Sequence, residues 1–235
     1  VQSAVVPAPP DAKVSQAAEV ISNAKYPIVM AGNGVIRHRA SDELAAFAEK
    51  LNLPVATTFM AKGAIPFSHS HSLGTVGLQS RDYVACGFDR ADVIICVGFD
   101  MVEYSPSLWH QDADRKIVHI DSMPAEVDKH YILEVGVTGC IADALNRIAD
   151  QARPQEKFLA EGLRKTIVEE LSQHQESTAF PMKPQKIIWD LRQALAPEDI
   201  VISDVGAHKM WMARMYQTEA PNTCIISNGF ASMGI

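Results

Sequence analysis

An alternation of short, unbroken apolar runs with longer helical stretches most constrains the fold. Residues 26–31 (YPIVMA), 93–97 (VIICV) and 117–120 (IVHI) are apolar at nearly every position. Such runs are typical of strands covered on both faces, as in a parallel sheet. The segments between them repeat apolar residues at the spacing of one helix face. Because helices connect successive parallel strands, the pattern predicts an α/β, doubly wound, Rossmann-like domain.

We expect about five or six strands in this domain, each followed by a helical connection. The expected strands are residues 26–31, 53–58, 93–97, 117–120 and 133–137, and helices are expected near 14–21, 41–51, 83 and 140–152. Ser41 is expected to cap the helix that follows it. Residues 62–79 read as one long loop.

The chain divides into four segments on composition. Residues 1–12 are a Pro-rich interdomain linker and residues 13–152 form the central domain. Residues 153–183 are a connector with a charged, solvent-facing helix over 155–175, broken by two prolines. Residues 184–235 begin a second α/β domain that we expect to be truncated, since its apolar strands end the sequence with the sheet unfinished. Its first helix is expected to bury Ile187, Ile188, Leu191 and Leu195.

Composition narrows the function classes. The 235 residues are 47% hydrophobic, which suffices for a sizeable core. The formal net charge is -7 and no block of Lys or Arg occurs, so the pattern argues against nucleic acid and anionic membranes as partners. No apolar run approaches the roughly 18 residues of a membrane helix, and no export leader precedes Pro7. We therefore expect a cytoplasmic protein that acts on a small molecule.

Cysteine and histidine spacing gives little sign of a metal site. The four cysteines lack C-x-x-C spacing, and Cys96 and Cys224 fall within apolar strands, which is typical of buried free thiols. His69 and His71 could ligate a metal, but no cysteine or carboxylate stands nearby at ligand spacing. We interpret them as part of a solvated loop.

Two glycine-containing turns are candidate ligand sites. Residues 32–34 (GNG) follow a strand, yet the third glycine of a dinucleotide fingerprint is replaced by Arg37. A tight strand-to-helix connection that needs glycine is the alternative. Asp121, at the end of a strand, could bind a ribose or cap the segment after it.

The second turn carries more converging features. Gly206 and Ala207 follow an apolar strand and allow close backbone approach, and His208 adds a side-chain donor at the start of a helix. This combination favours a phosphate or diphosphate ligand, because backbone N–H groups at a helix start point toward an anion. A surface or capping histidine is the alternative for His208.

The chain resembles the thiamine-diphosphate-dependent acetolactate synthase family from about Pro10 to its end. The resemblance rests on residues 31–35 (AGNGV), 117–121 (IVHID), 204–211 (DVGAHKMW) and 227–234 (SNGFASMG). The last two motifs are the specific ones. They imply the family's central domain followed by the opening of its cofactor-binding domain.

Carried over residue by residue, the resemblance assigns five positions to thiamine diphosphate. The Gly206 turn, Ala207 and His208 would contact the diphosphate, with His208 donating a hydrogen bond. Ala231 would offer its carbonyl to the aminopyrimidine, and Met233 would hold that ring and support the bent cofactor; core filling is the alternative for Met233. The family's catalytic glutamate and its Mg²⁺ ligands would lie outside this sequence, so residues 1–235 alone are expected to be inactive.

The resemblance also implies a subfamily and a reaction. Residues 98–104 (GFDMVEY) stand where flavin-binding relatives carry an arginine-containing run, so FAD is not expected. The complete protein is expected to condense two pyruvate molecules to 2-acetolactate with release of CO₂, as a homodimer or homotetramer. Another thiamine-diphosphate-dependent 2-oxo-acid decarboxylase or carboligase, and a non-catalytic nucleotide-binding module, are the alternatives.

Overall fold

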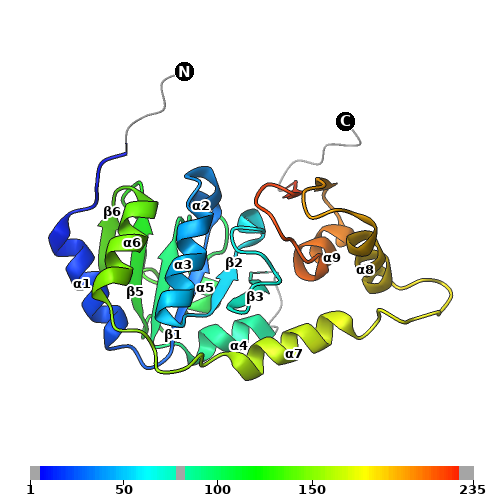
Figure 1. The fold of residues 1–235 in the computed structure, drawn as a ribbon, viewed down its shortest axis with the longest axis horizontal. Helices are drawn as coiled ribbons and strands as arrows, with labels where there is room; N and C mark the ends of the chain where they lie inside the picture. Colours follow the sequence, from blue (N-terminus) through cyan, green and yellow to red (C-terminus); the bar gives the residue numbers. More distant parts are fainter. Residues whose placement is uncertain (1–5, 78–82, 228–235) are drawn as a thin grey trace, which may run out of the picture.

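A computed structural model describes residues 6–77 and 83–227, and its centre is a six-stranded parallel sheet (Figure 1). The strand order is β3-β2-β1-β4-β5-β6, so the direction of winding reverses between β1 and β4. This order is that of a doubly wound, dinucleotide-binding type of sheet, and it confirms the predicted fold class. The strands are β1 (Pro27–Ala31), β2 (Val55–Thr57), β3 (Ser72–Thr75), β4 (Val93–Val97), β5 (Lys116–Asp121) and β6 (Leu133–Thr138).

Three helices cover one face of this sheet. They are α1 (Asp11–Ser22), α3 (Ser41–Leu51) and α6 (Ile141–Gln151), and the short α2 (Asn33–Arg37) follows β1 (Figure 1). Their apolar stripes share one buried cluster with the alternate residues of the strands. Phe47 of α3 and Ile148 of α6 are fully buried in it. The helical periodicity in the sequence therefore marked the faces that pack on the sheet.

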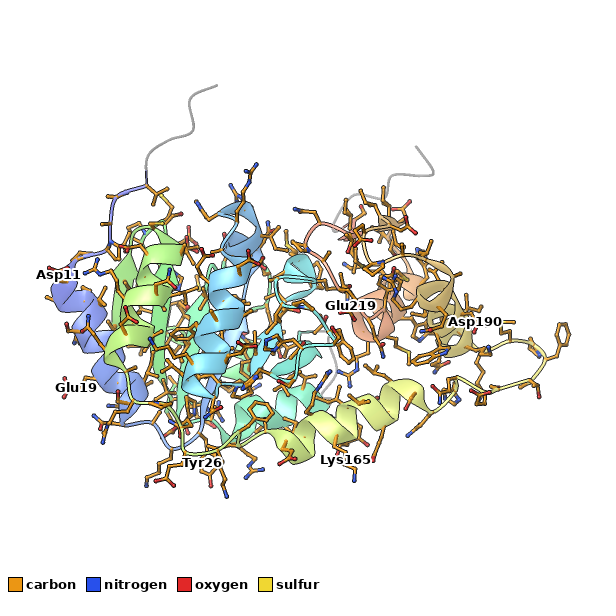
Figure 2. All side chains as sticks on the ribbon, in the orientation of Figure 1. Asp11, Glu19, Tyr26, Lys165, Asp190 and Glu219 are labelled. Carbon is orange, nitrogen blue, oxygen red and sulfur yellow. The ribbon has the colours of Figure 1, made fainter. Side chains whose placement is uncertain are left out.

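The opposite face is covered by α4 (Tyr83–Arg90), α5 (Pro106–Trp109) and α7 (Glu161–Ser172). The connector helix α7 was predicted to face solvent throughout, which is wrong for one of its sides. Ile167 and Leu171 are buried against the sheet unit, while Lys165 points outward (Figure 2). The charged residues of this helix lie on its outer side. Because they outnumber the apolar residues of the narrow inner stripe, the composition of the segment indicated a fully exposed helix.

Two local predictions also need correction. Ser41 is the first residue of α3 and not its cap; Ala40 holds the cap position, and its carbonyl accepts the Leu44 N–H at 3.0 Å. The expected loop over residues 62–79 contains the edge strand β3. Its sequence, SLGT, lacks the unbroken apolar run of the central strands although Ser72, Leu73 and Thr75 are all buried, so the apolar pattern did not mark it as a strand.

A small second unit follows the connector. It consists of α8 (Pro184–Ala194), β7 (Val201–Ser203), α9 (Ala207–Met215) and β8 (Cys224–Ile226), with β7 and β8 paired in parallel. Ile188 of α8 is buried with Met212, Tyr216 and Cys224. Ile187 was predicted to share this core but is 49% exposed, because only one stripe of α8 faces α9 and the strands.

Glycines let two turns of the sheet unit interlock. A Cβ atom at Gly34 would lie 2.6 Å from the Gly98 Cα, and one at Gly98 would lie 2.4 Å from the Val35 nitrogen. Gly98 also has a φ of +58°, which side chains other than glycine rarely adopt. The connection after β1 and the connection after β4 are therefore in backbone contact.

We predict that Gly98→Ala destabilises the protein by at least about 2 kcal/mol, through both steric overlap and backbone strain. Gly162→Ala in α7 is the matched control, because no described atom lies within 4 Å of the added methyl group. It should stabilise the helix by about 0.5 kcal/mol. Urea denaturation of both variants checks this, and equal midpoints would contradict it.

The segment between α7 and α8 should be the first site of proteolysis. Phe180 within it is 98% exposed and Met182 is also exposed, so its backbone is accessible on the surface. Brief digestion with a protease of broad specificity, followed by mass spectrometry, should find the first cuts at residues 178–184. Equally early cuts within residues 13–152 would be inconsistent with this expectation.

Candidate functional site

The turn between β7 and α9 places the predicted phosphate-binding residues on the surface. Gly206, Ala207 and His208 are all exposed at the start of α9. Gly206 has a φ of +152°, and a Cβ atom there would lie 2.8 Å from Cε1 of His208. The imidazole therefore lies against the Gly206 backbone, and the positive φ of Gly206 is a conformation that favours glycine.

The first turn of α9 is suited to an anion. It contains no acidic residue, and its N-cap residue, Gly206, has no side chain that could cap it. A helix N-terminus carries partial positive charge and unsatisfied donors, and the His208 ring can add a further donor. Gly206, Ala207 and His208 are thus brought together in a geometry that can receive a phosphate group. Their contact with a cofactor stays a prediction.

Two of the predicted site residues cannot be placed. Ala231 and Met233 lie outside the described residues, which end at 227. The last described residue, Ser227, still belongs to the sheet. Its N–H donates to the Ser203 carbonyl at 2.8 Å and extends the pairing of β7 with β8. The roles assigned to Ala231 and Met233 remain predictions from the resemblance.

A cavity of about 420 Å³ lies at the carboxyl ends of β1, β4 and β5. This is the point where the strand order reverses, which is where doubly wound sheets bind ligands. Basic and acidic groups both line it, among them Arg37, His38, Asp100, Asp121 and Glu126. The fold brings residues 32–34 and Asp121 to this cavity, as the dinucleotide interpretation required.

A buried carboxylate already occupies the anion position at this turn. The two Glu103 carboxylate oxygens accept the Asn33 N–H at 3.0 and 3.1 Å, and one of them accepts the Asp100 N–H at 3.3 Å. The Thr58 hydroxyl donates to the same group. Glu103 is only 5% exposed; burial raises its pKa and these hydrogen bonds oppose the rise. Sequence reasoning gave Glu103 no role, because its partners are 45 and 70 positions away.

The two glycines in residues 32–34 allow the close approach of the Gly98 backbone. Cβ atoms at Gly32 and Gly34 would lie 2.4 and 2.6 Å from the Gly98 backbone, which matches the alternative of a tight strand-to-helix connection. Asp121 accepts hydrogen bonds from Ser122 Oγ at 3.1 Å and from the Met123 N–H at 3.3 Å. Asp121 therefore caps the segment that follows its strand, which was the second interpretation of it.

A buried polar chain borders the cavity. His119 Nδ1 and the Tyr131 hydroxyl are 2.8 Å apart, and Tyr131 also interacts with the Cys96 thiol. Burial lowers the pKa of His119 and raises that of Cys96 to about 12. A thiol with this pKa stays protonated and unreactive. Cys96 and Cys224 are buried and all four cysteines are free, as predicted.

The remaining candidate features carry no ligand geometry. His69 Nε2 lies 3.1 Å from a Glu49 oxygen, and in the described parts of the chain no group of three His, Cys, Asp or Glu side chains could hold a metal. Among the same residues, no helix is long and apolar enough to cross a membrane. The two candidate sites are therefore the exposed turn before α9 and the cavity at the carboxyl ends of β1, β4 and β5.

Comparison with known proteins identifies the family of the chain. Residues 14–148 match the family described as "Thiamine pyrophosphate enzyme, central domain". The chain is 31% identical over 238 residues to the acetolactate synthase of Bacillus subtilis, covering 97% of this chain and 41% of that protein. It is 30% identical over 239 residues to the acetolactate synthase of Mycobacterium leprae, covering 96% of this chain and 37% of that protein.

A third relative, the acetolactate synthase large subunit of Corynebacterium glutamicum, is 30% identical over 240 residues, covering 94% of this chain and 37% of that protein. The chain thus spans about two fifths of the length of the curated relatives it matches. The six-stranded order of the sheet and this match over more than half of the chain agree. The chain belongs to the thiamine pyrophosphate enzyme family, whose central domain it contains.

Proposed function

We propose that this chain is part of an acetolactate synthase, which joins two pyruvate molecules to 2-acetolactate and releases CO₂. The names of its relatives support the reaction. The observation that carries the proposal within the structure is the exposed first turn of α9, which begins at a glycine N-cap and places the His208 ring against Gly206.

The residues present fit the diphosphate end of the cofactor. The N–H groups of the first turn of α9 would hold its oxygens, and His208 would donate a further hydrogen bond. Ala207 has no side-chain donor, so only its backbone can contribute. When bound, thiamine diphosphate supplies the carbon nucleophile that 2-oxo-acid chemistry needs, and the protein supplies orientation and electrostatics. Mg²⁺, when bound, would offset the charge of the diphosphate, and we propose that its ligands lie outside residues 1–235.

Product analysis of the full-length protein tests the reaction. With pyruvate, thiamine diphosphate and Mg²⁺, the proposal expects 2-acetolactate and CO₂ in equal amounts. An aldehyde as the main product would instead identify a 2-oxo-acid decarboxylase. No turnover, with a nucleotide bound, would favour a non-catalytic module. We further propose a homodimer or homotetramer in the cytoplasm, which size-exclusion chromatography with light scattering and cell fractionation would check.

His208→Ala should weaken cofactor binding in the full-length protein. Loss of one charge-assisted hydrogen bond to a diphosphate costs about 1.5–3 kcal/mol, which raises the half-saturating thiamine diphosphate concentration roughly ten- to a hundredfold. The fall in turnover at saturating cofactor should be much smaller, because the diphosphate is remote from the reacting carbon. Initial rates across a cofactor titration measure both quantities.

His130→Ala is the matched control, because His130 lies in the connection between β5 and β6 of the sheet unit. It should leave the half-saturating cofactor concentration unchanged. A collapse of saturated turnover in His208→Ala, with unchanged cofactor affinity, would place His208 at the substrate and contradict the proposed contact.

We also propose that the cavity at the carboxyl ends of β1, β4 and β5 holds no FAD. Glu103 takes the N–H donors that a phosphate would use, and Asp100, Asp121 and Glu126 add negative charge around the cavity. A diphosphate would meet repulsion there that Arg37 alone does not offset. The purified full-length protein should be colourless, with no flavin released on denaturation. Equimolar flavin in the released fraction would refute this.

A further inference from the structure

Lys62 is buried at the junction of the sheet unit and the second unit. Its side chain comes from the segment after the 3-10 turn η1 (Phe59–Ala61) and is 6% exposed. Its ammonium group donates to the carbonyls of Ala213 and Tyr216, each at 2.9 Å, and to the Thr75 hydroxyl at 3.2 Å. All three ammonium donors therefore have an acceptor.

Two of those acceptors belong to the C-terminal end of α9. The last carbonyls of a helix have no partner within the helix, and they carry the negative end of its dipole. Lys62 supplies both a positive charge and hydrogen-bond donors to that end from a distant part of the chain. Burial lowers the pKa of Lys62, because removing the ammonium group from water costs free energy. A neutral apolar side chain there would leave the carbonyls of Ala213 and Tyr216 unpaired.

The residues that follow Lys62 in the sequence contact the segment after α9. A Cβ atom at Gly63 would lie 2.2 Å from the Ala220 carbonyl oxygen, so the two backbones touch. The Phe67 N–H donates to the Thr218 carbonyl at 2.9 Å. Ser68 donates from its hydroxyl to Glu219 at 2.6 Å, and Glu219 lies between the two units in Figure 2. Residues 62–68 thus form a cradle for the end of α9 and the segment after it.

The opposite end of α9 is the cofactor turn. The helix has nine residues, so its first turn lies about 12 Å from the carbonyls that Lys62 holds. Lys62 cannot touch a ligand at Gly206–His208, but a tilt of the helix at one end displaces the other. Arg214 of α9 also pairs with Glu170 of α7 at 2.7 Å, which fixes the helix from a second side.

We propose that Lys62 is a positioning residue for cofactor binding, acting by fixing the C-terminal end of α9 so that the Gly206–His208 turn is held in place. This inference rests on the proposed function, in which that turn receives the diphosphate. Lys62 does not contact the cofactor. Its effect is transmitted through the rigid helix between the two sites.

The test compares Lys62→Met, Lys62→Arg and Ile148→Ala in the full-length protein. Lys62→Met removes the donors at similar side-chain length, and Lys62→Arg retains charge and donors. Ile148→Ala opens a cavity in the sheet core, far from α9, and serves as the control for lost stability. Melting temperature, half-saturating thiamine diphosphate and turnover at saturating cofactor are measured for each.

Lys62→Met should raise the half-saturating cofactor concentration about tenfold, with a much smaller fall in saturated turnover, and Lys62→Arg should recover most of this loss. Ile148→Ala should lower the melting temperature without shifting the cofactor titration. A shift of the cofactor titration in Lys62→Met no larger than that in Ile148→Ala, or a Lys62→Arg variant as impaired as Lys62→Met, overturns the proposal. If Lys62→Met does not fold, Lys62→Gln, which keeps a donor but not the charge, replaces it with the same expected and contradicting results.

Two further measurements separate this proposal from the proposed function. In a His208→Ala background, Lys62→Met should have a smaller effect than in the wild type, because the contact that it positions is already lost. Multiplicative effects would overturn the inference while leaving the cofactor assignment intact. Hydrogen exchange in residues 207–215 should accelerate in Lys62→Met and not in Ile148→Ala. Unchanged exchange would overturn the role of Lys62 even if the wild type does not bind thiamine diphosphate.

Discussion

The Glu103 carboxylate is the interaction on which the carboxyl edge of the sheet depends. It joins groups that follow three adjacent strands: the Thr58 hydroxyl after β2, the Asn33 N–H after β1 and the Asp100 N–H after β4. A buried carboxylate is tolerated only when hydrogen bonds replace water, and these donors provide the replacement. The same edge carries the backbone contact between Gly34 and Gly98, so the turn after β1 is held both by charge and by close packing.

This arrangement changes what the edge of the sheet can do. In a dinucleotide-binding sheet, the N–H groups at this turn face a phosphate. Here the Asn33 N–H is already paired with a side chain of the same unit, while the turn before α9 is exposed and begins at a glycine N-cap. The two strand-to-helix turns therefore differ. The first ties strands together, and the second is the one that we propose receives the diphosphate.

The parts of the fold that were predictable are those whose signal is local. Unbroken apolar runs marked β1, β4 and β5, and helical periodicity marked α1, α3 and α6. The edge strand β3 and the buried stripe of α7 were missed, since each shows only a partial apolar pattern. In the candidate site, the α9 turn was predictable because glycine and histidine lie within three positions. Glu103 and Lys62 were not, because their partners are tens to more than a hundred positions away.

Glu103 and Lys62 both satisfy backbone groups at a helix terminus, one at a helix start and the other at a helix end. Each is a buried ionisable side chain that pairs with backbone groups where regular structure ends. Glu103 accepts the Asn33 N–H at the start of α2, and Lys62 donates to the Ala213 and Tyr216 carbonyls at the end of α9. A charge bound in this way fixes the orientation of a whole element, because the backbone groups cannot find other partners without water. Since α9 carries its candidate ligand turn at the end opposite to Lys62, the anchoring and the binding can be separated along one helix. In the role that we propose for Lys62, the sheet unit fixes the geometry of the α9 turn through contacts at the far end of the helix.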